Sequence, residues 1–275
     1  MDWSLVLLSQ GIESVIDQPS EGAGWGLIVA ADNYETALAT IRQYQVENRG
    51  WPWQQTVLKP GVVFDWASLA WVAIVGFFYW LSIKTNLESA GIMDSSLVSH
   101  GEWWRLFTAI WLHADVAHLA TNATIGFVLL GAAMGRCGTG VGVLAAYVAG
   151  FGGNMASWLI AAGPHRSLGA SGMVMGCLGL LAGQSLLSWR RSPHATKYTI
   201  SAIAGGLMLF VLLALTPGTD VIAHLGGFVS GAVLGAALTL ARKVTQSPLA
   251  NVVCGFLFTA LVVIPWWAAL KTAPH

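Results

Sequence analysis

Charged side chains are scarce in this chain. Asp, Glu, Lys and Arg make up 9% of its 275 residues, whereas they account for about a quarter of a typical soluble domain. Hydrophobic residues make up 55%, which is typical of a protein that crosses the membrane several times. The 13 basic and 13 acidic residues cancel, so no nucleic-acid partner is expected. This composition predicts a polytopic protein of the lipid bilayer.

Cysteine is also rare. Cys137, Cys177 and Cys254 lie too far apart for the spacing of a metal site, so they are expected to be small buried hydrophobic residues. No metal ion and no cofactor is expected. A secretory signal peptide is not expected either, because the first apolar run, Leu5–Leu8, is short and no basic region precedes it.

The first 50 residues differ from the rest of the chain. They hold most of the acidic residues and contain no apolar run long enough to cross a bilayer. The stretches "IESVIDQ" and "WGLIVA" predict two short strands, and "DNYETALATIRQYQ" predicts a helix. We therefore expect a small soluble α/β domain over residues 1–50, on the cytoplasmic side, followed by a linker over residues 51–63.

Seven apolar segments of about 20 residues follow, each long enough to cross a bilayer as a helix. They predict an all-α polytopic membrane protein with a six-helix core, residues 64–241, and a seventh C-terminal transmembrane helix, residues 249–270. Nine of the 13 Lys and Arg residues fall on the inner side if the N-terminus is cytoplasmic, as the positive-inside rule favours. The predicted spans cover residues 64–83, 116–135, 140–162, 171–188, 198–216, 220–241 and 249–270.

The segment between the first two spans, residues 84–115, is rich in aromatic residues. Its second half is contained almost entirely in the stretch "GEWWRLFTAIWLHADVAH", which is amphipathic and too polar in places to be a span. Two interpretations are open: a helical hairpin half-sunk in the outer leaflet, or a plain extracytoplasmic loop with aromatic anchors.

The few polar side chains of the predicted spans gather at one depth. Polar groups are costly inside a bilayer, so each is a candidate functional residue. In the predicted orientation, spans two, four and six run from outside to inside, and these residues lie within the first two turns of such a span or just before it, within ~10 Å of the outer surface. They are His113, Asp115, His118, Asn122, Ser171, Asp220 and His224.

Ser171 and His224 are the candidates for a catalytic pair. A serine is a weak nucleophile that needs a base, and a neutral imidazole can take its proton. Glycines surround Ser171 in "GASG", and Gly227 and Gly231 follow His224; small residues let two helices approach closely. Helix packing alone would also explain the glycines, but the matched depth of Ser171 and His224 favours a catalytic dyad.

His118 and Asn122 are candidates for stabilising an oxyanion. They are four residues apart and so share one face of span two, and the backbone N–H groups at the start of span four add further donors. Alternatively, both side chains only hydrogen-bond neighbouring helices. Asp220 also has two interpretations: a cap at the start of span six, which is favoured, or a third group that orients His224.

Together, these candidate residues and their spacing resemble the rhomboid family of intramembrane serine proteases, over about residues 64–241. The resemblance implies Ser171 as nucleophile, His224 as general base, and an oxyanion site from His118, Asn122 and the backbone amide of Ser171. His113 would be a structural or water-holding residue, and the Trp104–Arg105 pair would shape the first loop. The matching motifs are "WR" at Trp104 and Arg105, "HADVAHLATN" at residues 113–122, "GASG" from Gly169 to Gly172, and "AHLGGFVSG" with His224, Gly227 and Gly231.

The chain departs from the common family pattern at Met175. An aromatic residue often occupies the position four after the serine; a methionine thioether can also pack against an imidazole. The seventh span lies outside the six-helix rhomboid-like core and resembles the family's 6+1 arrangement.

The predicted function is a serine endopeptidase that hydrolyses peptide bonds in or next to transmembrane helices, through a Ser–His dyad open to the extracytoplasmic side. Its substrates would be membrane proteins with helix-destabilising segments, because a regular helix hides its carbonyl groups. Compact loops and the orientation suit a bacterial inner membrane. The alternatives are a catalytically weak or silent relative that binds membrane helices, a transporter, whose polar sites would lie near the midplane, and a lipid hydrolase.

Overall fold

The computed structural model describes residues 2–17, 26–47, 64–188 and 219–272. The chain folds as two compact units, Met1–Gly61 and Val62–His275. The predicted linker, residues 51–63, and the fifth predicted span, residues 198–216, lie outside the described residues.

The first unit contains two helices and a pair of strands. Helix α1 (Asp2–Ser9) precedes the antiparallel strands β1 (Ser14–Asp17) and β2 (Gly26–Val29), and the 3-10 turn η1 (Ala31–Asn33) leads into α2 (Tyr34–Glu47). Its small apolar cluster consists of Leu7, Ile12 and Ala37. The strands and the second helix lie where the sequence predicts them, while the role of this unit as a separate soluble domain stays a prediction.

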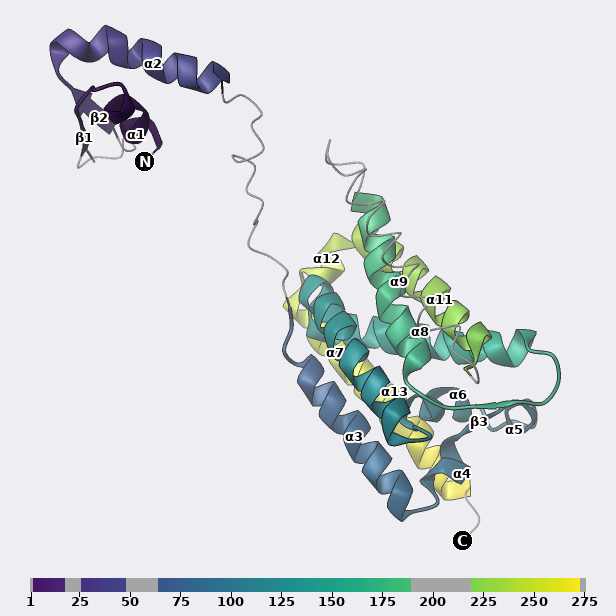
Figure 1. Cartoon of the computed structure of the whole chain (residues 1–275). Helices are drawn as coiled ribbons and strands as arrows, with labels where there is room; N and C mark the ends of the chain where they lie inside the picture. Colours follow the sequence, from purple (N-terminus) through teal and green to yellow (C-terminus); the bar gives the residue numbers. More distant parts are fainter. Residues whose placement is uncertain (1, 18–25, 48–63, 189–218, 273–275) are drawn as a thin grey trace. The chain divides into compact units, whose positions relative to one another are not determined.

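The second unit is mostly helical (Figure 1). Among the described residues, four helices are long and apolar enough to cross a membrane: α7 (Val116–Cys137), α8 (Thr139–Ile160), α11 (Val221–Leu240) and α13 (Pro248–Thr272). Two apolar helices are shorter, α3 (Ser68–Lys84) and α9 (Ser171–Ser188), and α12 (Arg242–Thr245) links α11 to α13. At 1.5 Å per residue, α3 is about 26 Å long, slightly less than a ~30 Å hydrocarbon core.

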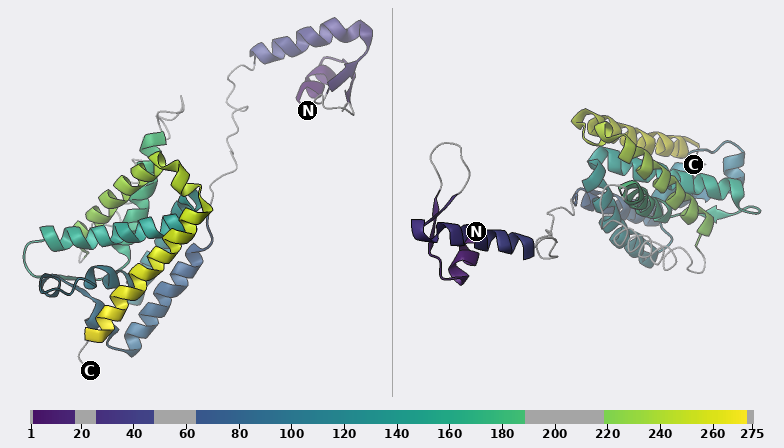
Figure 2. Two further views of the ribbon diagram at one scale, coloured as in Figure 1. Left: turned by 180° about the vertical axis from the view of Figure 1, so that it is seen from behind. Right: turned by 90° about the horizontal axis from the view of Figure 1, so that it is seen from above.

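Each of these six long or apolar helices overlaps one of the predicted spans. Helix α3 lies beside α7, and α11 packs against both α8 and α9. Figure 2 (left) shows α13 in yellow next to α3, where Trp266 of α13 stacks on Phe78 of α3 with ring centroids 5.2 Å apart. The full arrangement of six spans plus one stays a prediction, because the fifth span is not among the described residues.

The segment between α3 and α7 is a chain of short elements, neither a helical hairpin nor a plain loop. Strand β3 pairs antiparallel with β4, which lies just before α9. The side chain of Asp94 accepts hydrogen bonds from the amides of Ser96 and Leu97, so it starts a new helical turn where a hairpin would continue. The elements of this segment are α4 (Leu87–Gly91), β3 (Met93–Asp94), α5 (Ser95–Ser99), α6 (Arg105–Thr108) and η3 (Ala109–Trp111), and the partner strand β4 covers Arg166–Ser167.

Glycines bring α11 into backbone contact with α9, as the sequence predicts. A Cβ added at Gly227 would overlap the carbonyl oxygen of Gly172, and one added at Gly231 would overlap that of Gly176. Gly235 faces the carbonyl oxygen of Leu180 in the same way. This close approach along three successive turns fixes the spacing between the helix that begins with Ser171 and the helix that carries His224.

Gly231→Ala is expected to lower both stability and activity, while Gly76→Ala leaves both unchanged or slightly higher. The added methyl at Gly231 meets backbone that cannot rotate away, which costs about 3 kcal/mol, the upper part of the usual range for overpacking. At Gly76 on α3 the methyl meets no described atom within 4 Å, and alanine favours a helix. Thermal unfolding of the two variants in detergent tests this; equal midpoints would show that the α9–α11 contact is not tight.

Candidate active site

A cavity of about 860 Å³ collects most of the sequence-predicted residues. Its wall combines the start of α7, the segment before α9, the first turn of α9 and the start of α11. The predicted site residues on this wall are His118, Asn122, Gly169, Ser171, Gly172, Met175 and His224. Residues from three separate predicted spans therefore face one space, as expected from their common depth.

Ser171 and His224 sit at corresponding ends of two packed helices. Ser171 is the first residue of α9, and His224 lies in the first turn of α11 and is 3% exposed. A Cβ added at Gly172, next to Ser171, would lie 3.6 Å from the carbonyl oxygen of Ala223, next to His224. The glycine contacts between α9 and α11 therefore place the two candidate catalytic residues side by side in the cavity wall.

His118 and Asn122 approach the backbone just before Ser171. A Cβ added at Gly169 would lie 2.7 Å from Nε2 of His118, and the glycine has a φ of +128°, so both contact and conformation require glycine here. Asn122 Nδ2 would be 3.6 Å from the same Cβ. This amide is buried and donates to no hydrogen-bond acceptor among the described residues. It is a free donor in the cavity wall, close to Ser171.

His113 lies behind the cavity and holds the chain that leads to Ser171. Its ring is 3% exposed, and the amide of Ala170 donates to its Nε2 at 3.4 Å. Burial, with a smaller contribution from His118, lowers the pKa of His113 to about 4. The imidazole is therefore neutral near pH 7 and keeps a lone pair for Ala170. This position fits the structural role that the resemblance implies.

Asp220 caps α11. One carboxylate oxygen accepts from the amide of Ala223 at 2.9 Å, and the other accepts from the hydroxyl of Ser157 on α8. The Ser157 hydroxyl also lies 2.9 Å from Nε2 of His165. Both oxygens of Asp220 are thus used to hold the start of α11, which supports the cap among its two predicted roles.

Ser157 and His165 were missed by the sequence reasoning. Ser157 is fully buried near the end of α8, and it links α8 to the cap of α11. A serine in an apolar span does not by itself indicate a function, because its hydroxyl can donate to a backbone carbonyl oxygen of its own helix. Only its contact with Asp220, 63 residues away, marks it as part of the frame around the site.

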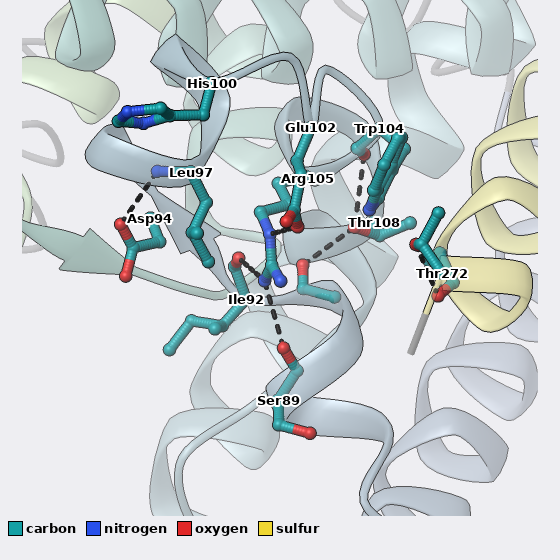
Figure 3. A network of polar contacts seen from close by, with 12 residues as sticks. Ser89, Ile92, Asp94, Leu97, His100, Glu102, Trp104, Arg105, Thr108 and Thr272 are labelled. Carbon is teal, nitrogen blue, oxygen red and sulfur yellow. Dashed lines mark hydrogen bonds and ion pairs between the residues drawn. The ribbon is translucent and has the colours of Figure 1, made fainter. Parts of the chain in front are cut away.

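Arg105 is buried and ties the short helices together, as shown in Figure 3. Its Nε donates to the carboxylate of Glu102 at 2.6 Å, and Nη1 donates to the carbonyl oxygens of Ser89 and Ile92 at 3.1 and 2.8 Å. The preceding Trp104 is buried in the main apolar core. Both side chains therefore contact the segment between α3 and α7, and the role of the pair in shaping this loop stays a prediction from the resemblance.

Arg105→Ala is expected to lower the free energy of unfolding by about 3 kcal/mol, because it leaves Glu102 and two carbonyl groups without their buried donor. Arg166→Ala is the matched control. Arg166 pairs with Asp94 at 2.9 Å, but its side chain is 64% exposed, so its loss is expected to cost less than about 1 kcal/mol. Thermal unfolding in one detergent compares the two variants, and equal losses of stability would contradict the role given to Arg105.

The second ion pair adds to the frame near the cavity. Burial by itself raises the pKa of Asp94, but hydrogen bonds from Leu97, Arg166 and Ser96 outweigh it and hold the pKa below its ordinary value. The carboxylate therefore stays charged at neutral pH. Through its ion pair with Arg166, Asp94 links β3 to β4. Strand β4 ends at Ser167, four residues before Ser171.

Met175 faces the cavity one turn after Ser171. It is 2% exposed and belongs to the main apolar core. Gly227 and Gly231 do not line the cavity; they act through the α9–α11 contact described above.

Comparison with known families matches residues 100–241, more than half of the chain, to the Rhomboid domain. The matched region contains every residue singled out above as a candidate for the site.

Curated proteins show the same likeness. The chain is 34% identical over 177 residues to "Rhomboid protease GluP" of Bacillus subtilis, which covers 60% of this chain and 33% of that protein. It is 37% identical over 156 residues to "RHOMBOID-like protein 1" of Arabidopsis thaliana, covering 54% of this chain and 38% of the relative. The matched part thus spans well under half the length of these two relatives.

Proposed function

The chain belongs to the rhomboid family, and on that premise we propose that it is an intramembrane serine endopeptidase. It is an integral membrane protein, with apolar helices long enough to cross a bilayer. In the proposed reaction Ser171 is the nucleophile and His224 the general base. The observation that carries the proposal is the cavity in which Ser171 and His224 meet the free buried amide of Asn122.

The reaction begins when Nε2 or Nδ1 of neutral His224 takes the proton of the Ser171 hydroxyl as Oγ attacks the substrate carbonyl carbon. The carbonyl oxygen becomes an oxyanion, which accepts hydrogen bonds from the side chains of Asn122 and His118 and from the backbone N–H of Ser171. The imidazolium then protonates the leaving amine, and the peptide bond breaks. Water, activated by His224, hydrolyses the acyl-enzyme and restores Ser171.

The proposed substrates are membrane proteins whose transmembrane helices unwind easily. A helix in lipid keeps its carbonyl groups in internal hydrogen bonds, so a peptide bond reaches Ser171 only after local unwinding. Helix-destabilising residues with small side chains near the cut lower the cost of that step. No metal ion or cofactor takes part in the proposed reaction.

We place the site on the extracytoplasmic side, with the N-terminus in the cytoplasm. The positive-inside distribution of Lys and Arg supports this orientation. In this orientation, α7, α9 and α11 all start on the outer side, and their first two turns carry the proposed catalytic and oxyanion residues. A bacterial inner membrane is the proposed location.

The test uses purified protein in liposomes with a single-span substrate that carries a Gly- and Ala-containing segment near its outer end. A matched substrate has leucines in that segment. Cleavage of the first, slower cleavage of the second, and a serine-directed fluorophosphonate adduct found on Ser171 by mass spectrometry are the expected results. Labelling without cleavage of any helix would favour a lipid hydrolase. Binding of the helix with neither labelling nor cleavage would favour a silent relative.

A further inference from the structure

Trp266, near the C-terminal end of α13, is one of the three buried residues of this helix, together with Pro265 and Ala269. It is 6% exposed, whereas its neighbour Trp267 is 62% exposed. The Trp266 ring stacks on Phe78 at an interplanar angle of 27°. The ring also packs against Gly91, where an added Cβ would lie 2.7 Å from Cη2 of the indole. Helix α13 thus inserts one large side chain into a place that only glycine leaves open.

The turn that ends at Gly91 is also hydrogen-bonded to α6. The hydroxyl of Thr108 donates to the carbonyl oxygen of Gly91 at 2.7 Å, and Arg105 donates to the carbonyl oxygens of Ser89 and Ile92 (Figure 3). The same added Cβ at Gly91 would lie 3.3 Å from a methyl group of Leu112. Helix α4 therefore contacts both Trp266 and the segment from α6 to Leu112.

That segment in turn holds the backbone directly before Ser171. The amide of Gly169 donates to the carbonyl oxygen of Ala109 at 2.9 Å. The amide of Ala170 donates to Nε2 of His113 at 3.4 Å. A continuous series of contacts therefore runs from Trp266 through Gly91, Thr108 and Ala109 to Gly169.

We propose that Trp266 is a positioning residue for Ser171, so that the seventh helix is part of the catalytic frame. Through α4 and α6, the indole sets the position of residues 109–113, and these set the backbone that presents the Ser171 hydroxyl and amide. The inference rests on the proposed protease function. Since a shift of about 1 Å at a reacting group can cost ~10²-fold in rate, a ring that does not line the cavity controls kcat by this route.

The first test compares Trp266→Ala with the control Trp267→Ala, alongside wild type and Ser171→Ala. Trp266→Ala is expected to lower kcat by about 10- to 100-fold with KM little changed, because the substrate path is intact and the nucleophile is displaced. Trp267→Ala is expected to match wild type. Active protein is counted by titration with the fluorophosphonate, so that a smaller folded fraction is not mistaken for a lower kcat.

The second test uses the fit between the two residues. Gly91→Ala is expected to lower kcat, because its methyl meets Cη2 and Cζ3 of Trp266. Phenylalanine lacks those two atoms, so Gly91→Ala combined with Trp266→Phe is expected to recover much of the lost rate. Such recovery is a coupling that a general loss of stability does not produce. If the double variant is as slow as the product of the single losses, the proposed contact does not transmit position.

Hydrogen–deuterium exchange separates this inference from the proposed function. The amides of Gly169 and Ala170 are expected to exchange faster in Trp266→Ala than in wild type or Trp267→Ala, since their acceptors move. Wild-type activity no higher than that of Ser171→Ala would overturn the protease proposal, and the exchange result would still decide the positioning role. Unchanged exchange together with an unchanged kcat in Trp266→Ala would overturn the inference.

Discussion

Ser171→Ala is expected to abolish proteolysis, with a loss of at least about 10³-fold in kcat, because alanine has no group that forms the acyl-enzyme. The substitution removes one hydroxyl at the start of α9 and leaves the glycine contacts of that helix with α11 unchanged. Folding should therefore be retained. The measurement is the initial rate of cleavage in liposomes, with labelling by the fluorophosphonate as a second readout.

Ser185→Ala is the matched control on the same helix. The Ser185 hydroxyl donates to the carbonyl oxygen of Leu181 within α9 and does not line the cavity, so its loss is expected to leave the rate of cleavage unchanged.

His224→Ala is expected to lose about as much activity as Ser171→Ala, because the effects of removing members of one catalytic unit are not additive. Wild-type rates in Ser171→Ala would refute Ser171 as the nucleophile.

Asn122→Ala is expected to lower kcat by ~10²- to 10³-fold, the usual cost of removing one oxyanion donor. Asn122 is 5% exposed, and within the described part of the chain its side-chain amide has no acceptor for its N–H groups. Such a donor gains its partner when the substrate oxygen becomes charged, so KM is expected to change little. Steady-state kinetics on the single-span substrate separate the two parameters.

Thr121→Ala provides the control for Asn122. Thr121 also lines the cavity, but its hydroxyl donates to the carbonyl oxygen of Ala117 in the same helix. Its loss is expected to change kcat by less than about 3-fold, because a hydroxyl already paired within its helix stabilises no transition-state charge. A rise in KM at constant kcat for Asn122→Ala would instead assign the amide to substrate binding in the ground state.

The candidate site was largely predictable from the sequence because its signals are local. Polar side chains are expensive in a bilayer, so His118, Asn122, Ser171 and His224 stand out against apolar surroundings. Long apolar segments mark helices by length alone, and this located α7, α8, α11 and α13. Because an α-helix rises 1.5 Å per residue, the predicted helix starts also gave these four residues a common depth in the membrane.

The frame around the site was not predictable, because its contacts join residues that are distant in sequence or use backbone groups. Arg105 binds the carbonyl oxygens of Ser89 and Ile92, and every residue type has a carbonyl. The Ser157 hydroxyl donates to the side chain of Asp220, which lies 63 residues away in the sequence. Neither of the two interpretations of residues 84–115, a helical hairpin or a plain loop, matches the structure, and the reason is the same: capping and pairing by Asp94 divide the segment into short helices.

Composition and the spacing of polar residues in apolar segments determined the class of protein and the candidates for nucleophile, base and oxyanion donors. Those properties depend on side-chain chemistry and on helix geometry, which are both readable along the chain. The tertiary structure alone decided which contacts surround these groups, including the contacts of α13 with Phe78 and Gly91. The fit of the Trp266 ring against Gly91, 175 residues apart, is a match of shapes, and the free energy of such a match exists only after the helices have packed.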